Sequence, residues 1–170
     1  MAFKEFMVKK QKTGKDVLLG VLCYILATVV SLALFVILAK TPFGGISLLL
    51  IVGAFYAAHM YASRLNKEFE YICTDDTVDI DMIFNKSRRK RLISFTLGQT
   101  EVIASVKDER YNSQSKGSFD KVIDATSGAN ENVYFAIVEK NGRNLVKFEP
   151  SASVLEHLSQ YARSKVHIYN

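Results

Sequence analysis

The longest uncharged stretch of the chain, residues 17–39, most constrains what it can fold into. It holds 23 consecutive residues without a charge, and as a helix it would be about 34 Å long, enough to span a bilayer. A second stretch, residues 46–63, has 18 uncharged residues, or about 27 Å as a helix, near the lower limit for spanning. We therefore predict two membrane-spanning helices.

The connection between these stretches, residues 40–45 with the sequence KTPFGG, is short and contains Pro and two Gly. Such a connection returns the second helix antiparallel to the first as a hairpin. A cleaved signal peptide is the alternative for the first stretch. Its apolar part is longer than a signal peptide needs, and no small-x-small cleavage site follows, which disfavours that alternative.

Lys and Arg flank the hairpin unevenly, and this pattern predicts its orientation. The basic residues outside its tip are Lys4, Lys9, Lys10, Lys12, Lys15, Arg64 and Lys67, whereas the tip has only Lys40. Because cytoplasmic flanks are enriched in Lys and Arg, we expect a multi-pass protein of the cell membrane with both termini in the cytoplasm.

The net charge of +5 does not indicate a nucleic-acid partner once it is divided by segment. Residues 1–16 carry five Lys against Glu5 and Asp16, whereas residues 64–170 carry 16 cations and 15 anions. The larger segment is nearly neutral, so we predict no binding to nucleic acid. Cys23 and Cys73 have no spacing typical of a disulfide framework or a metal site, and we expect buried reduced thiols.

From residue 67 onward the apolar period changes to two, which is typical of half-buried strands. Seven strands are predicted, at residues 68–74, 77–84, 90–97, 101–107, 121–125, 132–140 and 143–149. Asn141-Gly142 is a strong hairpin signal between the last two. A helix follows within residues 150–165, with Val154, Leu155, Leu158, Tyr161 and Ala162 on one face and Ser153 with Glu156 as a capping box.

This order of elements predicts a membrane α-hairpin followed by a mainly-β domain. Seven strands and one C-terminal helix fit a pleckstrin-homology-like (PH-like) barrel whose helix plugs one end; a generic sandwich or a smaller roll are the alternatives. The expected organisation is a basic cytoplasmic N-terminus at residues 1–16, a transmembrane hairpin at 17–63 (helices 17–39 and 46–63) and a PH-like cytoplasmic domain at 67–170.

Several motifs in this order resemble a family of small, uncharacterised bacterial membrane proteins with a domain of unknown function. They are KKQKTGKD, the membrane hairpin, EFEYICTDDTVDIDMIFNKSRRKRL, KVIDATSG, YFAIVEKNGRNLVKFEP and the closing helix. The resemblance covers nearly the whole chain and implies a PH-like cytoplasmic part. It implies no catalytic or binding residue.

A basic run, Lys86, Arg88, Arg89, Lys90 and Arg91, is the main candidate site. Asp79 and Asp81 of the preceding strand fall within cross-strand reach of it, so one interpretation is a structural hairpin with matched charges. The other is contact with anionic membrane lipid, which attracts cations beside a membrane. A protein partner or nucleic acid are further alternatives.

Small residues in the second hydrophobic stretch form two rows at helical spacing, Gly53 with Ala57, and Ala54 with Ala58 and Ala62; Ala27 and Ser31 make a shorter row in the first stretch. Such rows permit close packing of helices, within the hairpin or against another membrane protein or a second copy. His59 lies near the cytoplasmic end of the second stretch, and we expect a residue that is either interfacial or hydrogen-bonded.

Motifs for catalysis are missing from the sequence: we find no nucleophile elbow and no metal-spaced His or Cys set. Residues 108–120 and 125–130 are polar segments that we interpret as surface loops rather than phosphate sites. We therefore expect no enzyme, no cofactor and no metal. The expected function is a non-enzymatic, membrane-anchored module that tethers or assembles partners at the cytoplasmic face; the alternative is an anionic-lipid-sensing module that uses the basic hairpin 86–91.

Overall fold

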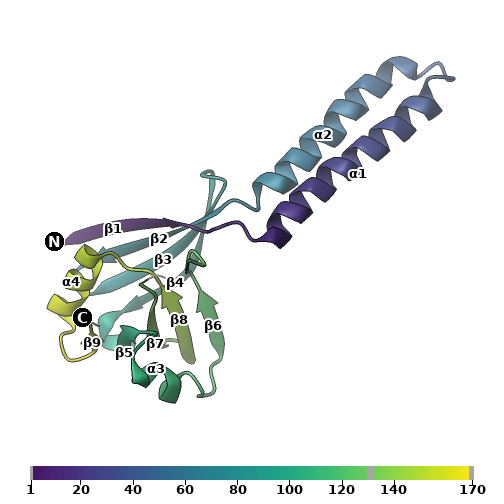
Figure 1. Ribbon diagram of the computed structural model, residues 1–170. Helices are drawn as coiled ribbons and strands as arrows, with labels where there is room; N and C mark the ends of the chain where they lie inside the picture. Colours follow the sequence, from purple (N-terminus) through teal and green to yellow (C-terminus); the bar gives the residue numbers. More distant parts are fainter. Residues whose placement is uncertain (1, 130–131, 169–170) are drawn as a thin grey trace. The chain divides into compact units, whose positions relative to one another are not determined.

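A computed structural model describes residues 2–129 and 132–168 of the chain. The chain divides into two compact units (Figure 1): a helical unit, residues 12–67, and a β unit that combines residues 1–11 with residues 68–170. The N-terminal segment that the sequence suggested was separate therefore belongs largely to the β unit. The helical hairpin is inserted between the first strand of this unit and the rest.

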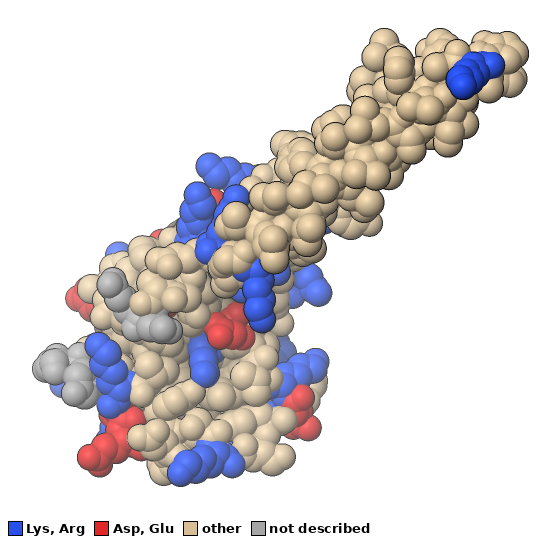
Figure 2. Space-filling model, turned by 45° about the vertical axis from the view of Figure 1, so that its right-hand side comes forward, with Lys and Arg blue, Asp and Glu red and all other residues tan. Residues whose placement is uncertain are grey.

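The helical unit consists of α1 (Gly14–Leu38), a short 3₁₀ turn η1 (Gly44–Ile46) and α2 (Ser47–Ser63). α1 begins at a capping box, in which Thr13 Oγ1 accepts from the Asp16 amide and the Asp16 carboxylate accepts from the Thr13 amide. Most apolar side chains of the hairpin point outward; Leu26 is 64% and Leu48 is 70% exposed. Both helices are long and apolar enough to cross a membrane, and Figure 2 shows their surface almost free of charged side chains.

The first sheet of the β unit contains β1 (Phe3–Lys9), β2 (Lys67–Thr74), β3 (Thr77–Phe84) and β4 (Arg88–Thr96), in that order. β1 is antiparallel to β2, with Lys9 opposite Glu68. The β3–β4 turn uses Asn85 and Lys86, which both have positive φ (46° and 55°). Two such residues are typical of the hairpin turn that follows strand twist.

The second sheet contains β5 (Thr100–Ser105), β6 (Lys121–Asp124), β7 (Tyr134–Glu139), β8 (Arg143–Phe148) and β9 (Val166–His167). Its order is β6-β8-β7-β5-β9, with β6 and β9 parallel to their neighbours. A 3₁₀ turn, η2 (Leu97–Gln99), leads from the first sheet into β5. Asn141 and Gly142 both have positive φ (51° and 107°), so the predicted hairpin is confirmed.

The main core is formed by the inner faces of both sheets together with α4 (Ala152–Tyr161). Leu158 of α4 is fully buried in it, so the helix packs against the sheets as expected. Two details of this helix were wrong. Its N-cap is Ser151, whose hydroxyl accepts from the Val154 amide, and Tyr161 is 44% exposed and donates its hydroxyl to Asp75 instead of entering the core.

A second, smaller core covers the outer face of the second sheet. The short helix α3 (Glu109–Gln114) places the Tyr111 ring 5.2 Å from the buried Phe135 ring, and Phe119 packs against the same cluster. The segment 108–120, interpreted as a surface loop, thus forms a covering layer. Its two aromatic residues among polar neighbours were the signal for this role.

The predicted barrel needs correction, although all seven predicted strands are present. The structure has two further strands, β1 and β9, and its strands form sheets of four and five that do not close into a barrel. Among the described residues no strand pairing joins β4 to β6, the edges of the two sheets. The additional strands escaped prediction because β9 has only two residues and β1, with the sequence FKEFMVK, was counted as a basic tail.

Candidate functional site

The basic run lies on the β3–β4 turn and the first half of β4, where all five candidate cations are exposed. Pairing places Arg88 opposite Phe84 and Arg91 opposite Asp81, with a shift in register between Ile80 and Asp81. The shift is a bulge, which adds one residue to β4. Arg89 and Arg91 therefore face the same side of the sheet as the carboxylates of β3.

Arg91 holds two carboxylates of β3. Its Nε lies 2.6 Å from Asp81 Oδ1, and its Nη1 lies 2.8 Å from Asp79 Oδ2. Asp81 is only 1% exposed, so the cross-strand pair expected from the sequence joins an exposed guanidinium to a buried carboxylate. The hydrogen bond with Asp81 raises the pKa of the Arg91 guanidinium above its usual value. A buried carboxylate of this kind needs its partner, because an unpaired buried charge is costly.

Arg89 reaches across the sheet to β2. Its Nη2 lies 2.7 Å from Oε2 of Glu70, which is only 2% exposed, and its Nη1 lies 3.8 Å from Asp81. Burial, followed by hydrogen bonding with the Glu5 carboxyl, raises the pKa of Glu70. The two arginines are thus engaged in a network within the sheet, while Lys86, Arg88 and Lys90 have no ion pair among the described residues.

A groove of about 430 Å³ lies on the outer face of the first sheet, beside the β3–β4 turn. Its lining residues are Met7, Val8, Lys9, Glu68, Glu70, Ile83, Lys86 and Arg89. Three of its charged residues, Lys9, Glu68 and Glu70, were not among the site residues predicted from the sequence. In FKEFMVK, Phe6 and Val8 occupy alternate positions, with Glu5 before them and Lys9 after them. This alternation was the signal for a strand that contains Lys9.

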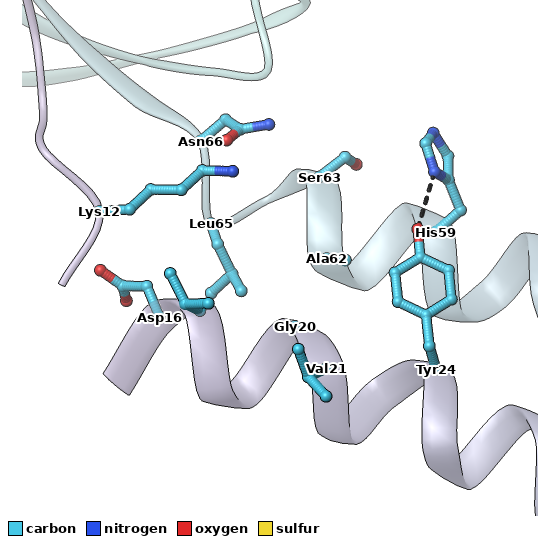
Figure 3. A pocket seen from close by; sticks show the side chains of 11 residues that line it. Lys12, Asp16, Gly20, Val21, Tyr24, His59, Ala62, Ser63, Leu65 and Asn66 are labelled. Atoms are coloured by element: carbon cyan, nitrogen blue, oxygen red, sulfur yellow. Dashed lines mark hydrogen bonds between the residues drawn. The ribbon is translucent and has the colours of Figure 1, made fainter. Parts of the chain in front are cut away.

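A separate pocket of about 310 Å³ lies in the helical unit, between the start of α1 and the end of α2 (Figure 3). His59 points toward Tyr24, with its Nδ1 3.2 Å from the Tyr24 hydroxyl. This is the hydrogen-bonded arrangement expected for His59. Lys12, Asp16 and Asn66 lie around the opposite end of the pocket.

The two small-residue rows of α2 have different environments. Ala58 is buried, and Ala54 and Ala62 are half-buried. Ala27 and Ser31 of α1 are buried as well. Gly53 and Ala57 are exposed, and a side-chain carbon added at Gly53 would meet nothing within 4 Å. The row with Ala58 therefore packs within the hairpin, and the row with Gly53 faces outward.

Residues 126–129 make only local or structural contacts. Ser127 donates its hydroxyl to Glu149, and the Ala129 amide donates to Ser127; residue 130 lies outside the described residues. No group of three His, Cys, Asp or Glu side chains with metal-binding geometry occurs in the described part of the chain. Cys73 is fully buried, and burial raises its thiol pKa to about 12.

Comparison with known proteins agrees with this architecture. A family model described as a bacterial PH-like domain (DUF6106), a domain of unknown function, matches residues 2–168. No curated protein and no solved structure matches the chain. The match includes β1, the helical hairpin and every later element, so it extends over both units. The chain belongs to the bacterial PH-like domain family DUF6106.

Proposed function

We propose that this protein is a non-enzymatic, membrane-anchored module that holds and assembles partners at the cytoplasmic face of the membrane. The pairing of Lys9 with Glu68 is the observation that carries this proposal. The segment from β1 to α1 starts beside this pair, and the segment from α2 to β2 ends beside it. One end of the first sheet is therefore joined to the hairpin by two chain segments. A connection of four residues, such as 10–13, spans at most about 14 Å, and this end stays close to the membrane.

The edges of the two sheets supply a surface for a partner. Val122 of the edge strand β6 is 63% exposed. On the β4 edge, the Ser94 carbonyl accepts from Lys140 Nζ instead of from a neighbouring strand. Strand edges that lack a neighbouring strand are common sites of protein association, because a partner strand can pair with them.

Purification of the full-length chain from native membranes in mild detergent tests this function. We expect a partner, or a second copy, at a constant molar ratio through size-exclusion chromatography. Val122→Lys should lower that ratio, while Lys116→Gln, an exposed change in the layer over the second sheet, should leave it unchanged. Recovery of a bare monomer with lipid alone would overturn the proposal.

A second candidate function is sensing of anionic lipid by the basic hairpin. Lys86, Arg88 and Lys90 favour it, since they are exposed and lie at the tethered end of the sheet. The ion pairs of Arg89 and Arg91 weaken it, because these cations are already neutralised.

The full-length chain in nanodiscs tests the lipid-sensing function. The fragment 67–170 is unsuitable, because it lacks β1. Hydrogen exchange at residues 85–90 should slow when anionic lipid replaces neutral lipid, and high salt should reverse the effect by screening. Equal exchange in both lipids would exclude this function.

A further inference from the structure

We propose that the groove on the outer face of the first sheet binds a headgroup that carries both a phosphate and a primary ammonium, as phosphatidylethanolamine does. The proposal rests on the membrane anchoring assumed above and names a ligand for a site beside the tether. It differs from anionic-lipid sensing, because the acidic residues of the groove take part as much as the basic ones.

Charges of both signs meet in this groove. Lys9 and Lys86 are exposed and have no ion pair among the described residues, while Glu68 is half-buried and Glu70 is almost fully buried. A purely anionic ligand would be repelled by the two carboxylates, and a purely cationic one by the lysines. A ligand with one phosphate and one ammonium matches both sets.

Glu70 is the residue that favours an ammonium. Its Oε1 accepts from Arg89 Nη2 at 2.9 Å, whereas its Oε2, 2.7 Å from the same nitrogen, has no hydrogen-bond partner. The Glu5 carboxyl lies beside it and adds a second acid to the same place. One guanidinium thus serves two adjacent carboxyls, and a primary ammonium would add three N–H donors and a second positive charge.

The lysines and the turn suit the phosphate. Lys86 sits in the β3–β4 turn and lines the groove. Lys9 lies across the first sheet on β1, beside the start of the connection to α1. Ammonium groups of this kind act as point charges for phosphate.

The apolar part of the groove fits a lipid rather than a soluble metabolite alone. Met7, Val8 and Ile83 line it, and Met7 is 54% exposed to solvent. The glycerol and first acyl carbons of a phospholipid would cover this surface. A soluble phosphoethanolamine would leave it exposed, and we therefore expect the lipid to bind more tightly.

The experiment compares three lipids with identical short acyl chains on the full-length protein in detergent. The lipids are phosphatidylethanolamine, phosphatidylcholine and phosphatidylglycerol, and the bound fraction is measured by native mass spectrometry. Phosphatidylethanolamine should bind better than phosphatidylcholine by about tenfold, the scale of one lost charge-assisted hydrogen bond, because a quaternary ammonium has no N–H donor. Equal binding of all three, or the tightest binding for phosphatidylglycerol, would overturn the proposal.

Variants assign the effect to the groove. Glu68→Gln and Glu70→Gln should each remove the preference for phosphatidylethanolamine over phosphatidylcholine, and Glu68→Gln remains informative if the buried change at Glu70 prevents folding. Lys86→Gln should weaken the two lipids equally. Glu109→Gln and Lys116→Gln, exposed residues far along the chain, are the controls. A preference that persists in both glutamate variants would exclude the groove.

Competition with soluble phosphoethanolamine distinguishes binding of the free headgroup from binding of the headgroup in a lipid. If it displaces the bound lipid, the groove recognises the free headgroup too; if it does not while the lipid binds, the site is restricted to lipid. Displacement and lack of displacement are both consistent with the proposal, provided that the protein prefers phosphatidylethanolamine over phosphatidylcholine. Co-purification of a partner is a separate measurement. Absence of the preference for phosphatidylethanolamine would therefore overturn the lipid site and not the proposed assembly function.

Discussion

Lys9, the last residue of β1, is paired with Glu68 near the start of β2. Paired residues on neighbouring strands lie about 5 Å apart, and neighbouring packed helices lie about 8–10 Å apart. A β-hairpin connection can therefore be replaced by a helical hairpin with only a few linking residues. The helical hairpin of this chain is such an insertion, and it is joined to the β unit by two chain segments rather than one.

Arg91 is predicted to stabilise the fold, although it belongs to a run of exposed cations. Arg91→Gln leaves the buried Asp81 without its closest partner, and we expect a loss of about 1–3 kcal/mol in the free energy of unfolding. The adjacent change Lys90→Gln should cost less than about 0.5 kcal/mol, the usual surface range. Equal melting curves for the two variants in detergent would contradict the importance of the Arg91 network.

Glu70 is predicted to make stability depend on pH. Its pKa is raised by burial, so the folded state binds a proton more tightly than the unfolded state, whose pKa is near 4.5. Stability from this group is fully present below about pH 4.5 and is lost as pH rises through the folded pKa. Compared with Glu70→Gln, the native chain should therefore gain thermal stability as pH falls toward about 4.5, and Glu109→Gln should show the same gain as the native chain.

The docking of α4 is predicted to be essential for the main core. Leu158 is fully buried between the sheets, so Leu158→Ala should cost about 2–5 kcal/mol through lost burial and a residual cavity. Thermal melts of the full chain in detergent measure the effect. Gln160→Ala, an exposed change on the same helix, is the control. An equally small loss in the free energy of unfolding for both variants would mean that the helix does not support the core.

The sequence predicted the parts of this fold that depend on local pattern. Seven strands, the closing helix and the Asn141-Gly142 turn follow from apolar period and turn chemistry, which act within a few residues. β1 could not be predicted in this way, because its partner, β2, lies about sixty residues later, beyond the hairpin. The burial of Glu70 and Asp81 also depends on that pairing and on the bulge opposite Asp81.

The basic run shows the same limit for a functional site. Its composition was compatible with lipid contact and with a structural hairpin, since both need exposed cations. Only the register decides which cations are engaged: Arg89 and Arg91 face the carboxylates, and Lys86, Arg88 and Lys90 do not. A bulge of one residue reverses which side chains face which side, and no local pattern fixes it.

The membrane orientation predicted from the Lys distribution can be tested by cysteine labelling in intact cells. Thr41 lies near the exposed tip of the hairpin, and Lys116 is exposed in the β unit. In a chain with Cys23 replaced by Ala, a membrane-impermeant maleimide should label Thr41→Cys from outside and Lys116→Cys only after permeabilisation. Native Cys73 should not interfere, because it is buried and its pKa is raised to about 12, so little thiolate forms at neutral pH. The reverse labelling pattern would place the β unit outside and would remove the basis for partner assembly at the cytoplasmic face.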